Sequence, residues 1–130
     1  MKLQTNKRPY NTIIPAFMTK DGKPVGPFGV MGGYMQPQGH VQVVMNHIDF
    51  AMDPQQALDA PRFQWMRDGS VTVESRFDPE LARALRRMGH RVRVDLDTGS
   101  FGRGQMIVRL DNGVLVGGTE SRTDSNIACY

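Results

Sequence analysis

Residues 23–52 read KPVGPFGVMGGYMQPQGHVQVVMNHIDFAM. The run Lys23–Met31 has the composition of a strand, and Gly32-Gly33 ends it. Beyond the glycine pair, the segment Gln38–Met52 carries apolar residues at the spacing of one face of an amphipathic helix. These apolar residues are Val41, Val44, Met45, Ile48 and Met52. The stretch therefore predicts a strand, a glycine turn and a long helix, in that order.

The flanking sequence predicts further short elements on both sides. Thr12–Met18 is a β-rich run, and the turn dipeptide Asp21-Gly22 joins it to Lys23–Met31 as a hairpin. Pro24 and Pro27 push that returning strand toward an edge or a bulge. More strands are expected at Phe63–Met66, Val71–Glu74, Arg91–Leu96, Gln105–Leu110 and Val114–Gly117, the last two joined by Asp111-Asn112-Gly113.

Two shorter helices begin with the same device, an aspartate cap followed by proline. Asp53-Pro54 precedes a helix over Gln55–Ala60, and Asp78-Pro79 opens another that Gly89 ends. The stripe expected to face the core of the second helix is Leu81, Ala84, Leu85 and Met88. The predicted order is ββααββαβββ. This is an α+β domain with a mainly antiparallel sheet and two to three helices.

Composition excludes several classes of protein. With 130 residues, 39% hydrophobic and 22% charged, the chain is one globular domain. Cys129 is the single cysteine, so intrachain disulfides and cysteine clusters are excluded. No apolar run approaches the ~20 residues of a membrane span, and no apolar segment follows the basic start. We therefore expect no membrane partner and a cytoplasmic location.

The net charge of +3 raises the question of nucleic-acid binding. The stretch 25–61 contains three acids and no lysine or arginine, and the arginine-rich stretch 62–95 has few aromatics for stacking. We expect a solvated basic helix and no nucleic-acid partner. His40, His47 and His90 do not have the spacing of a catalytic zinc site, and no nucleophile-elbow sequence is present. We expect no metal and no cofactor.

The glycine pair is the strongest local candidate for chemistry. Gly32-Gly33 follows a predicted strand and precedes the long helix, without the Lys-Ser/Thr of a nucleotide-binding loop. Successive glycines at such a turn let backbone N–H groups point at an anion or a developing oxyanion. From spacing alone, a plain tight turn remains the simpler interpretation.

An ordered set of motifs gives a more specific interpretation. The set is Lys7-Arg8, Asp21-Gly22-Lys23-Pro24-Val25, Gly29-x-x-Gly32-Gly33, Asp59-Ala60-Pro61-Arg62-Phe63, Met88-Gly89-His90 and the tail Gly117-Gly118-Thr119-Glu120-Ser121-Arg122-Thr123-Asp124. Over about residues 7–130 the chain resembles the C-terminal part of the small subunit of the γ-glutamyltranspeptidase family, within the N-terminal-nucleophile (Ntn) hydrolase superfamily. The resemblance implies a partial αββα domain over residues 10–130, preceded by a flexible tether over residues 1–9.

The resemblance also implies roles for individual residues. The family's glycine pair supplies the oxyanion hole, here Gly32 and Gly33. The family's paired serines, which hold the α-carboxylate of the γ-glutamyl group, correspond to Asn11 and Thr12. That departure puts glutamyl specificity in doubt, although both residues can donate hydrogen bonds. Arg62 and Arg122 match the family pattern and are expected to be structural ion-pair partners without a catalytic role.

The family's nucleophile is a threonine freed as a new N-terminus, and it lies upstream of all these motifs. Thr5 and Thr12 stand in other contexts. Whether the chain alone is an enzyme is therefore open. One interpretation is part of a γ-glutamyl or other small-amide acyltransferase or hydrolase, inactive without its upstream part or large subunit. The other is a non-catalytic remnant that forms homodimers or binds a subunit.

Overall fold

The computed structural model describes residues 5–8 and 12–130. Residues 1–4 and 9–11 lie outside the described part of the chain, and Asn11 is among them. Of the predicted tether, only residues 5–8 are described, and they are exposed. Among the described residues, no helix has the length and apolar character needed to cross a membrane.

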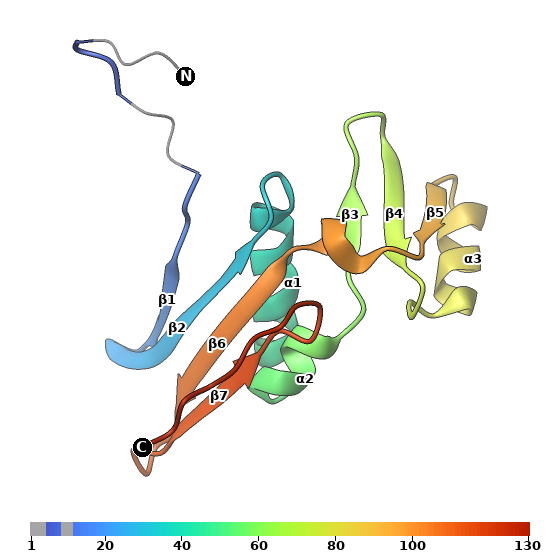
Figure 1. Cartoon of the computed structure of the whole chain (residues 1–130). Coiled ribbons are helices and arrows are strands. Elements are labelled where there is room, and N and C mark those ends of the chain that lie inside the picture. Colours follow the sequence, from blue (N-terminus) through green and yellow to red (C-terminus); the bar gives the residue numbers. More distant parts are fainter. Residues whose placement is uncertain (1–4, 9–11) are drawn as a thin grey trace.

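The larger sheet has four strands, all antiparallel, in the order β1-β2-β6-β7. The strands are β1 (Ala16–Lys20), β2 (Lys23–Met31), β6 (Arg103–Arg109) and β7 (Leu115–Thr119). Two helices, α1 (Met35–Ile48) and α2 (Pro54–Asp59), pack on this sheet, α1 on β2 and α2 on β6 and β7 (Figure 1). The order of strands and helices agrees with the prediction.

Turn chemistry sets the geometry of the first hairpin. Asp21 and Gly22 both have positive φ, 51° and 73°, as the predicted two-residue hairpin turn requires. The pairing register then shifts, because Met18 faces Gly26 while Thr19 faces Pro24. Of the edge or bulge that the prolines predicted, the structure has the irregular register of a bulge, whereas β2 is an inner strand between β1 and β6.

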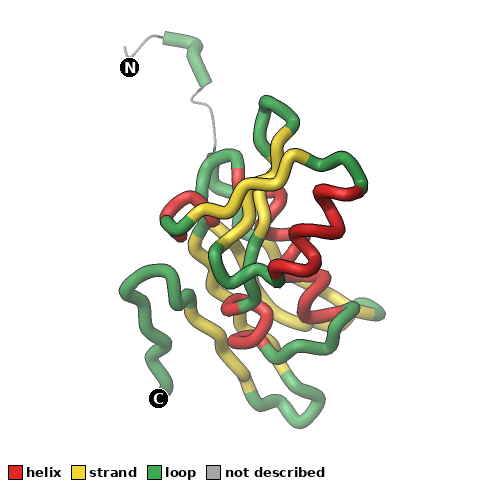
Figure 2. The backbone as a smooth tube through the Cα atoms, turned by 90° about the vertical axis from the view of Figure 1, so that its right-hand side faces the viewer, coloured by secondary structure: helices red, strands yellow, loops and turns green. Residues whose placement is uncertain are grey.

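The smaller sheet has three strands in the order β3-β4-β5. These are β3 (Phe63–Trp65), β4 (Ser70–Glu74) and β5 (Arg91–Asp95), and β4 pairs with β5 in parallel across the helix α3 (Pro79–Arg87). Figure 2 views the molecule from this side, with α3 and the small sheet in front of the large sheet. A 3-10 helix at Thr98–Phe101, absent from the prediction, leads back to the large sheet. The fold is α+β and mainly antiparallel, as predicted.

The predicted apolar face of α1 is not the face that packs on the sheet. Val41, Met45 and Ile48 are 57%, 44% and 59% exposed, and the helix spans Met35–Ile48, not Gln38–Met52. The side that is buried comprises Met35, Gln36, Gly39, Gln42 and Val43. A Cβ added at Gly39 would lie 2.7 Å from Val30 Cγ1, so the helix approaches β2 along its smallest side chain. Close packing, and not the most apolar stripe, selects this face.

The predicted core stripe of α3 needs a similar correction. Leu81 is 49% exposed and Met88 is 74% exposed, whereas the buried residue of this helix is Ala82. Ala82 packs with Val73 and Val92 of the small sheet, and Leu85 adds a partly buried contact. The helix lies close to a small sheet, so one short side chain is enclosed and the longer ones remain at the rim.

Glutamine side chains of α1 join the helix to the outer edge of β3. The Gln42 side chain donates to the Phe63 carbonyl at 2.8 Å and accepts from the Phe63 N–H at 3.0 Å. Gln38 repeats this pattern with Trp65, at 3.2 and 2.7 Å. The two amides, one helical turn apart, satisfy the backbone edge that β4 does not pair.

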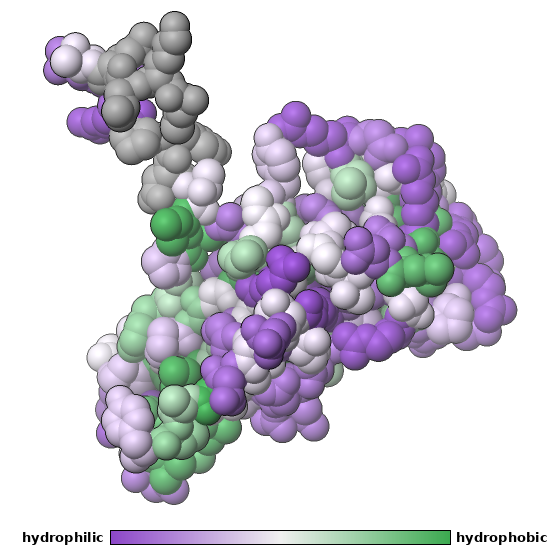
Figure 3. Space-filling model, viewed as in Figure 1, coloured by the Kyte–Doolittle hydropathy of each residue, from purple (hydrophilic) through white to green (hydrophobic). Residues whose placement is uncertain are grey.

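Large apolar side chains remain exposed on the large sheet as well. Figure 3 shows hydrophobic residues gathered over the end of this sheet where the β6–β7 turn and the C-terminus lie. Leu110, Val114 and Leu115 of that turn region are 42%, 51% and 65% exposed. Several large exposed apolar side chains in one region are typical of surfaces that contact another chain.

Candidate functional site

The glycine pair occupies the turn between β2 and α1, as the sequence predicted. The carbonyl of Gly32 accepts from the Met35 N–H at 3.0 Å, and that of Gly33 accepts from the Gln36 N–H at 3.2 Å. These bonds tie the turn to the first residues of the helix. Within residues 5–8 and 12–130, the N–H groups of Gly32 and Gly33 donate to no acceptor. Two backbone donors are therefore left for a ligand or solvent.

The two glycines are required for different reasons. Gly32 has φ +149°, and a Cβ added there would lie 2.8 Å from Gly102 Cα, inside the backbone of a neighbouring segment. Gly33 has φ +58°, but an added Cβ would meet nothing within 4 Å. Gly32 is thus packed against the protein, whereas Gly33 faces open space.

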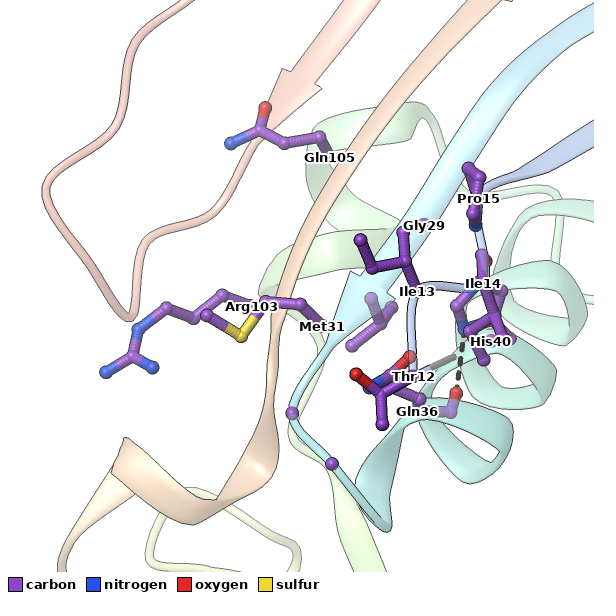
Figure 4. Close-up of a pocket in the computed structure, with 13 residues that line it drawn as sticks. Thr12, Ile13, Ile14, Pro15, Gly29, Met31, Gln36, His40, Arg103 and Gln105 are labelled. Atoms are coloured by element: carbon purple, nitrogen blue, oxygen red, sulfur yellow. Dashed lines mark hydrogen bonds between the residues drawn. The ribbon is translucent and has the colours of Figure 1, made fainter. Parts of the chain in front are cut away.

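A pocket of about 460 Å³ lies over this turn (Figure 4). Its wall is formed by four parts of the chain: residues 12–15, the end of β2 with the glycine pair, the first turns of α1, and the start of β6. The lining residues include Thr12, Ile14, Gly32, Gly33, His40 and Arg103. Thr12 therefore lines the same pocket as the glycine pair, while Asn11 lies outside the described residues.

His40, to which sequence reasoning assigned no role beyond the exclusion of a zinc site, also lines this pocket. Its Nδ1 lies 2.7 Å from the Gln36 carbonyl oxygen, and its Nε2 lies 3.0 Å from the Ile14 carbonyl oxygen. The imidazole thus bridges α1 and the segment before β1. His47 lies two turns further along α1 with Nδ1 2.8 Å from the Met52 carbonyl, outside the pocket.

Four buried charged side chains form a network beside the pocket: Arg62, Glu74, Glu120 and Arg122. Arg62 pairs with Glu120 at 2.9 Å, and Arg122 pairs with Glu74 at 2.5 Å and with Glu120 at 2.8 Å. These side chains are at most 2% exposed. The prediction that both arginines are structural ion-pair partners is confirmed. Their acidic partners were not identified from the sequence. Arg62 and Glu120 are 58 residues apart and Arg122 and Glu74 are 48 apart, which leaves no local signal, although Glu120 lies only two residues from Arg122.

The network also holds the backbone that lies next to the glycine turn. Arg62 Nη1 donates to the carbonyls of Phe101 and Gly102 at 3.1 and 3.0 Å, and the Gly104 N–H donates to Glu120 at 2.6 Å. Gly102 is the residue that packs against Gly32. The buried charges therefore hold the backbone on which the glycine turn rests. Arg62 Nε has no acceptor among the described residues.

The environment of Glu120 favours its ionised form. Burial alone would raise the pKa of this carboxyl, but the charge of Arg62 and hydrogen bonds from Arg122 and the Gly104 N–H hold it below its ordinary value. Burial alone would lower the pKa of Arg122, yet its hydrogen bonds to Glu74 and Glu120 raise it. Both groups therefore stay charged at neutral pH.

Other sequence candidates do not form a second site. Within the described residues, no group of three His, Cys, Asp or Glu side chains is arranged to hold a metal ion. Cys129 is exposed. The glycine pocket is thus the place where backbone donors, a threonine and an imidazole come together.

The α+β fold thus carries, at the end of β2, a glycine turn whose two N–H groups have no acceptor among the described residues, next to a buried ion network. The chain matches the family model described as Gamma-glutamyltranspeptidase over residues 1–130, and it belongs to that family. The Ntn-hydrolase superfamily inferred from the motifs is consistent with this membership.

Individual relatives show a range of activities in their names. The chain is 35% identical to the glutathione hydrolase-like YwrD proenzyme of Bacillus subtilis strain 168, over 94% of this chain and 24% of that protein. It is 32% identical to the oxamate amidohydrolase proenzyme of Klebsiella pneumoniae, over the whole chain and 26% of that protein. The chain spans about a quarter of the length of these curated relatives.

Solved structures agree with the fold. A crystal structure of cephalosporin acylase from Bacillus halodurans is 58% identical, with a TM-score of 0.92 over 98% of this chain and 24% of that chain. A γ-glutamyltranspeptidase from Helicobacter pylori is 25% identical, with a TM-score of 0.80 over 93% of this chain and 66% of that chain. The chain is similar to acylases and transpeptidases of one fold.

Proposed function

We propose that this chain contributes the oxyanion hole and part of the acyl-donor pocket of an acyltransferase or amidohydrolase of the γ-glutamyltranspeptidase family. The observation that carries the proposal is the glycine turn: Gly32 and Gly33 line a pocket, and their N–H groups have no acceptor among the described residues. Preorganised N–H donors in such a place stabilise the negative charge that develops on a carbonyl oxygen during acyl transfer.

The proposed substrate is a small amide, with a γ-glutamyl amide as the first candidate. Thr12 lies in the wall of the same pocket and offers a hydroxyl for the acyl group. Asn11, the other residue that the family resemblance assigned to the acyl group, lies outside the described residues, so its role stays a prediction. Since the relatives' names include an oxamate amidohydrolase and a cephalosporin acylase, the acyl group need not be glutamyl.

The proposed chemistry needs a nucleophile that this chain does not supply. In the family the nucleophile is an N-terminal threonine whose own amine acts as base. An oxyanion hole stabilises a charge only when some nucleophile creates it. We therefore propose that the 130-residue chain needs a further part of the enzyme, and that it is inactive alone.

A chimera tests this proposal. The chain replaces the matching 24% of the Bacillus halodurans cephalosporin acylase, which is 58% identical to it. Turnover of small amides, including γ-glutamyl anilides, is then measured for the chimera and for the isolated chain. We expect turnover from the chimera and none from the isolated chain. Turnover by the isolated chain, lost on changing one of its own residues, would contradict the proposal.

A glycine substitution in the chimera tests the oxyanion role. Gly33→Ala adds a methyl group that meets no neighbour, but it strains a residue at φ +58° and shifts its N–H. Loss of a single oxyanion donor typically costs about 10²- to 10³-fold in kcat. Glu80→Ala, on an exposed ion pair of α3, is the matched control and should leave kcat unchanged. Equal rates for both variants would exclude the glycine turn from the reaction.

A second candidate function is a non-catalytic module that acts by assembling with another chain or with a second copy. It is favoured by the exposed side chains of Val41 and Met45 on α1, which line a groove of about 630 Å³ together with Phe50, Phe63 and Leu81. Sedimentation of the isolated chain at micromolar concentration distinguishes the cases. A two-fold dimer supports self-association, and a clean monomer excludes it.

A further inference from the structure

The ring of His40 contacts two carbonyl oxygens at once. Gln36, whose carbonyl lies 2.7 Å from Nδ1, is one turn earlier on the same helix. Ile14, whose carbonyl lies 3.0 Å from Nε2, belongs to the separate segment that precedes β1. All three residues line the glycine pocket (Figure 4).

These two contacts constrain the protonation state of the ring. A carbonyl oxygen only accepts hydrogen bonds, and a neutral imidazole has one N–H donor and one lone pair. In either neutral tautomer, one ring nitrogen would present its lone pair to a carbonyl oxygen. Only the imidazolium, with a donor on both nitrogens, makes both bonds.

The residues around the ring offer no acid that would stabilise the positive charge of an imidazolium. From β2, Phe28 lies with its ring centroid 5.4 Å from that of His40, and neither Phe28 nor Gly29 is titratable. Residues 12–15 carry no charge. The charged side chain in the described pocket wall is Arg103 of β6, and Figure 4 shows its guanidinium extending away from His40. No acid lines the described wall, so the charge of the imidazolium is met by carbonyl dipoles.

We propose that His40 is a positioning residue: as an imidazolium it donates to Gln36 and to Ile14, and so holds residues 12–15 against α1. Thr12 lies two residues before Ile14 and lines the same pocket as Gly32. The His40 bridge therefore sets the separation between the threonine hydroxyl and the glycine amides. This consequence for substrate rests on the proposed function, whereas the bridge itself does not.

The bridge depends on pH. Loss of the ring proton removes one of the two hydrogen bonds, and the bond within α1 is kept because the helix holds Gln36 one turn away. The contact to Ile14 is the one that is lost, so residues 12–15 are released from the helix as the pH rises.

Nuclear magnetic resonance of the 130-residue chain tests the bridge directly. The chain is labelled with ¹⁵N-histidine and with ¹³C at isoleucine carbonyls, and spectra are recorded across the imidazole titration. We expect both ring nitrogens of His40 to be protonated at the acidic end, and the Ile14 carbonyl signal to shift with the same midpoint as the ring. A constant Ile14 carbonyl signal, or a neutral single tautomer throughout, would overturn the proposal.

Two variants complete the test. His47→Gln removes a histidine of the same helix whose contact is to Met52, so the Ile14 titration should persist. His40→Gln should fix the Ile14 carbonyl signal at its high-pH value at every pH. If His40→Gln does not fold, the titrations of the unsubstituted chain and of His47→Gln decide the matter.

The chimera adds a functional readout. His40→Gln should raise KM about fivefold at the acidic end, the factor of one hydrogen bond, and leave KM unchanged at the basic end. If the ratio of KM for His40→Gln to KM for the unsubstituted chimera is the same at both ends of the pH range, the His40 bridge does not affect substrate binding. An inactive chimera would contradict the proposed function, while the spectra still report on the bridge.

Discussion

The buried ion network and the glycine pocket meet at Gly102 but are built in opposite ways. The network encloses four charged side chains, at most 2% exposed, that pair with one another in two arginine–glutamate sets sharing Glu120. The pocket leaves the amides of Gly32 and Gly33 without acceptors among the described residues and is walled partly by exposed side chains. Buried polar groups that bond to other groups of the protein stabilise the fold, whereas polar groups without a partner in the protein are available to bind a ligand.

The two regions are nevertheless mechanically linked. Arg62, held by Glu120, donates to the Gly102 carbonyl, and Gly102 packs against Gly32. A substitution in the network should therefore also change the backbone at the glycine turn. A substitution of an exposed residue that lines the pocket should leave the ion pairs of the network unchanged. The following substitutions test that asymmetry.

The largest effect is expected from Glu120→Ala. The change leaves Arg62 and Arg122 without a shared carboxylate and the Gly104 N–H without its acceptor. Breaking a buried pair by removing one partner costs about 3–5 kcal/mol of the free energy of unfolding. Urea denaturation followed by circular dichroism measures this loss.

The matched control for that substitution is the exposed pair of α3. Glu80 and Arg83 lie 2.7 Å apart with side chains 67% and 56% exposed. Because water already solvates both charges, Glu80→Ala should change the free energy of unfolding by at most about 0.5 kcal/mol. Similar losses for Glu80→Ala and Glu120→Ala would contradict the structural role of the network.

The next effect compares the two glycines. Gly32→Ala forces a methyl group toward Gly102 Cα and should cost about 2–3 kcal/mol, because backbone must move at a strained φ. Gly33→Ala meets no neighbour and should cost about 1 kcal/mol from its positive φ alone. Denaturation of both variants measures the difference, and equal costs would show that Gly32 is not packed as described.

The free energy of unfolding is expected to depend gradually on pH in the acidic range. The pKa of Glu120 is lower in the folded chain than its ordinary value of 4.5, so its ionised form stabilises the fold above that value. This stability is lost as the pH falls from 4.5 through the lower, folded pKa. In Glu120→Gln the free energy of unfolding should depend less on pH in this acidic range. An unchanged acid profile would contradict the assignment.

The smallest effect on stability is expected from Thr12→Val in the open wall. Thr12 is exposed, so the free energy of unfolding should change by no more than about 0.5 kcal/mol. In the chimera, loss of one hydrogen bond to the acyl group should raise KM about fivefold. A large loss of stability with unchanged KM would place Thr12 in the fold and outside the proposed substrate site.

Local sequence chemistry predicted the turns and caps of this fold well. Asp53 and Gln56 form a reciprocal capping box at the start of α2, where an aspartate cap followed by proline was expected. At the start of α3, Asp78 accepts from the Glu80 N–H, a single cap bond without the reciprocal one. Such signals depend on residues a few positions apart, so the sequence carries them completely.

The same reasoning failed on which helix faces are buried. The spacing of Val41, Met45 and Ile48 correctly indicated a helix, but the packed face runs through Gly39 and Val43. Periodicity reports where apolar residues lie on a helix and contains no information about its neighbour. The pairing of Gln38 and Gln42 with the edge of β3 was missed for the same reason.

The sequence by itself determined the order of the strands and helices, the glycine turn between β2 and α1, the family and the two arginines of the network. Only the tertiary structure decided that Arg62 pairs with Glu120 and Arg122 with Glu74, and which segments line the pocket together with the glycine pair. It also revealed that His40 bridges Gln36 and Ile14. The physical reason is distance along the chain: turns and caps are short-range, whereas charge pairing and pocket walls join segments that only folding brings together.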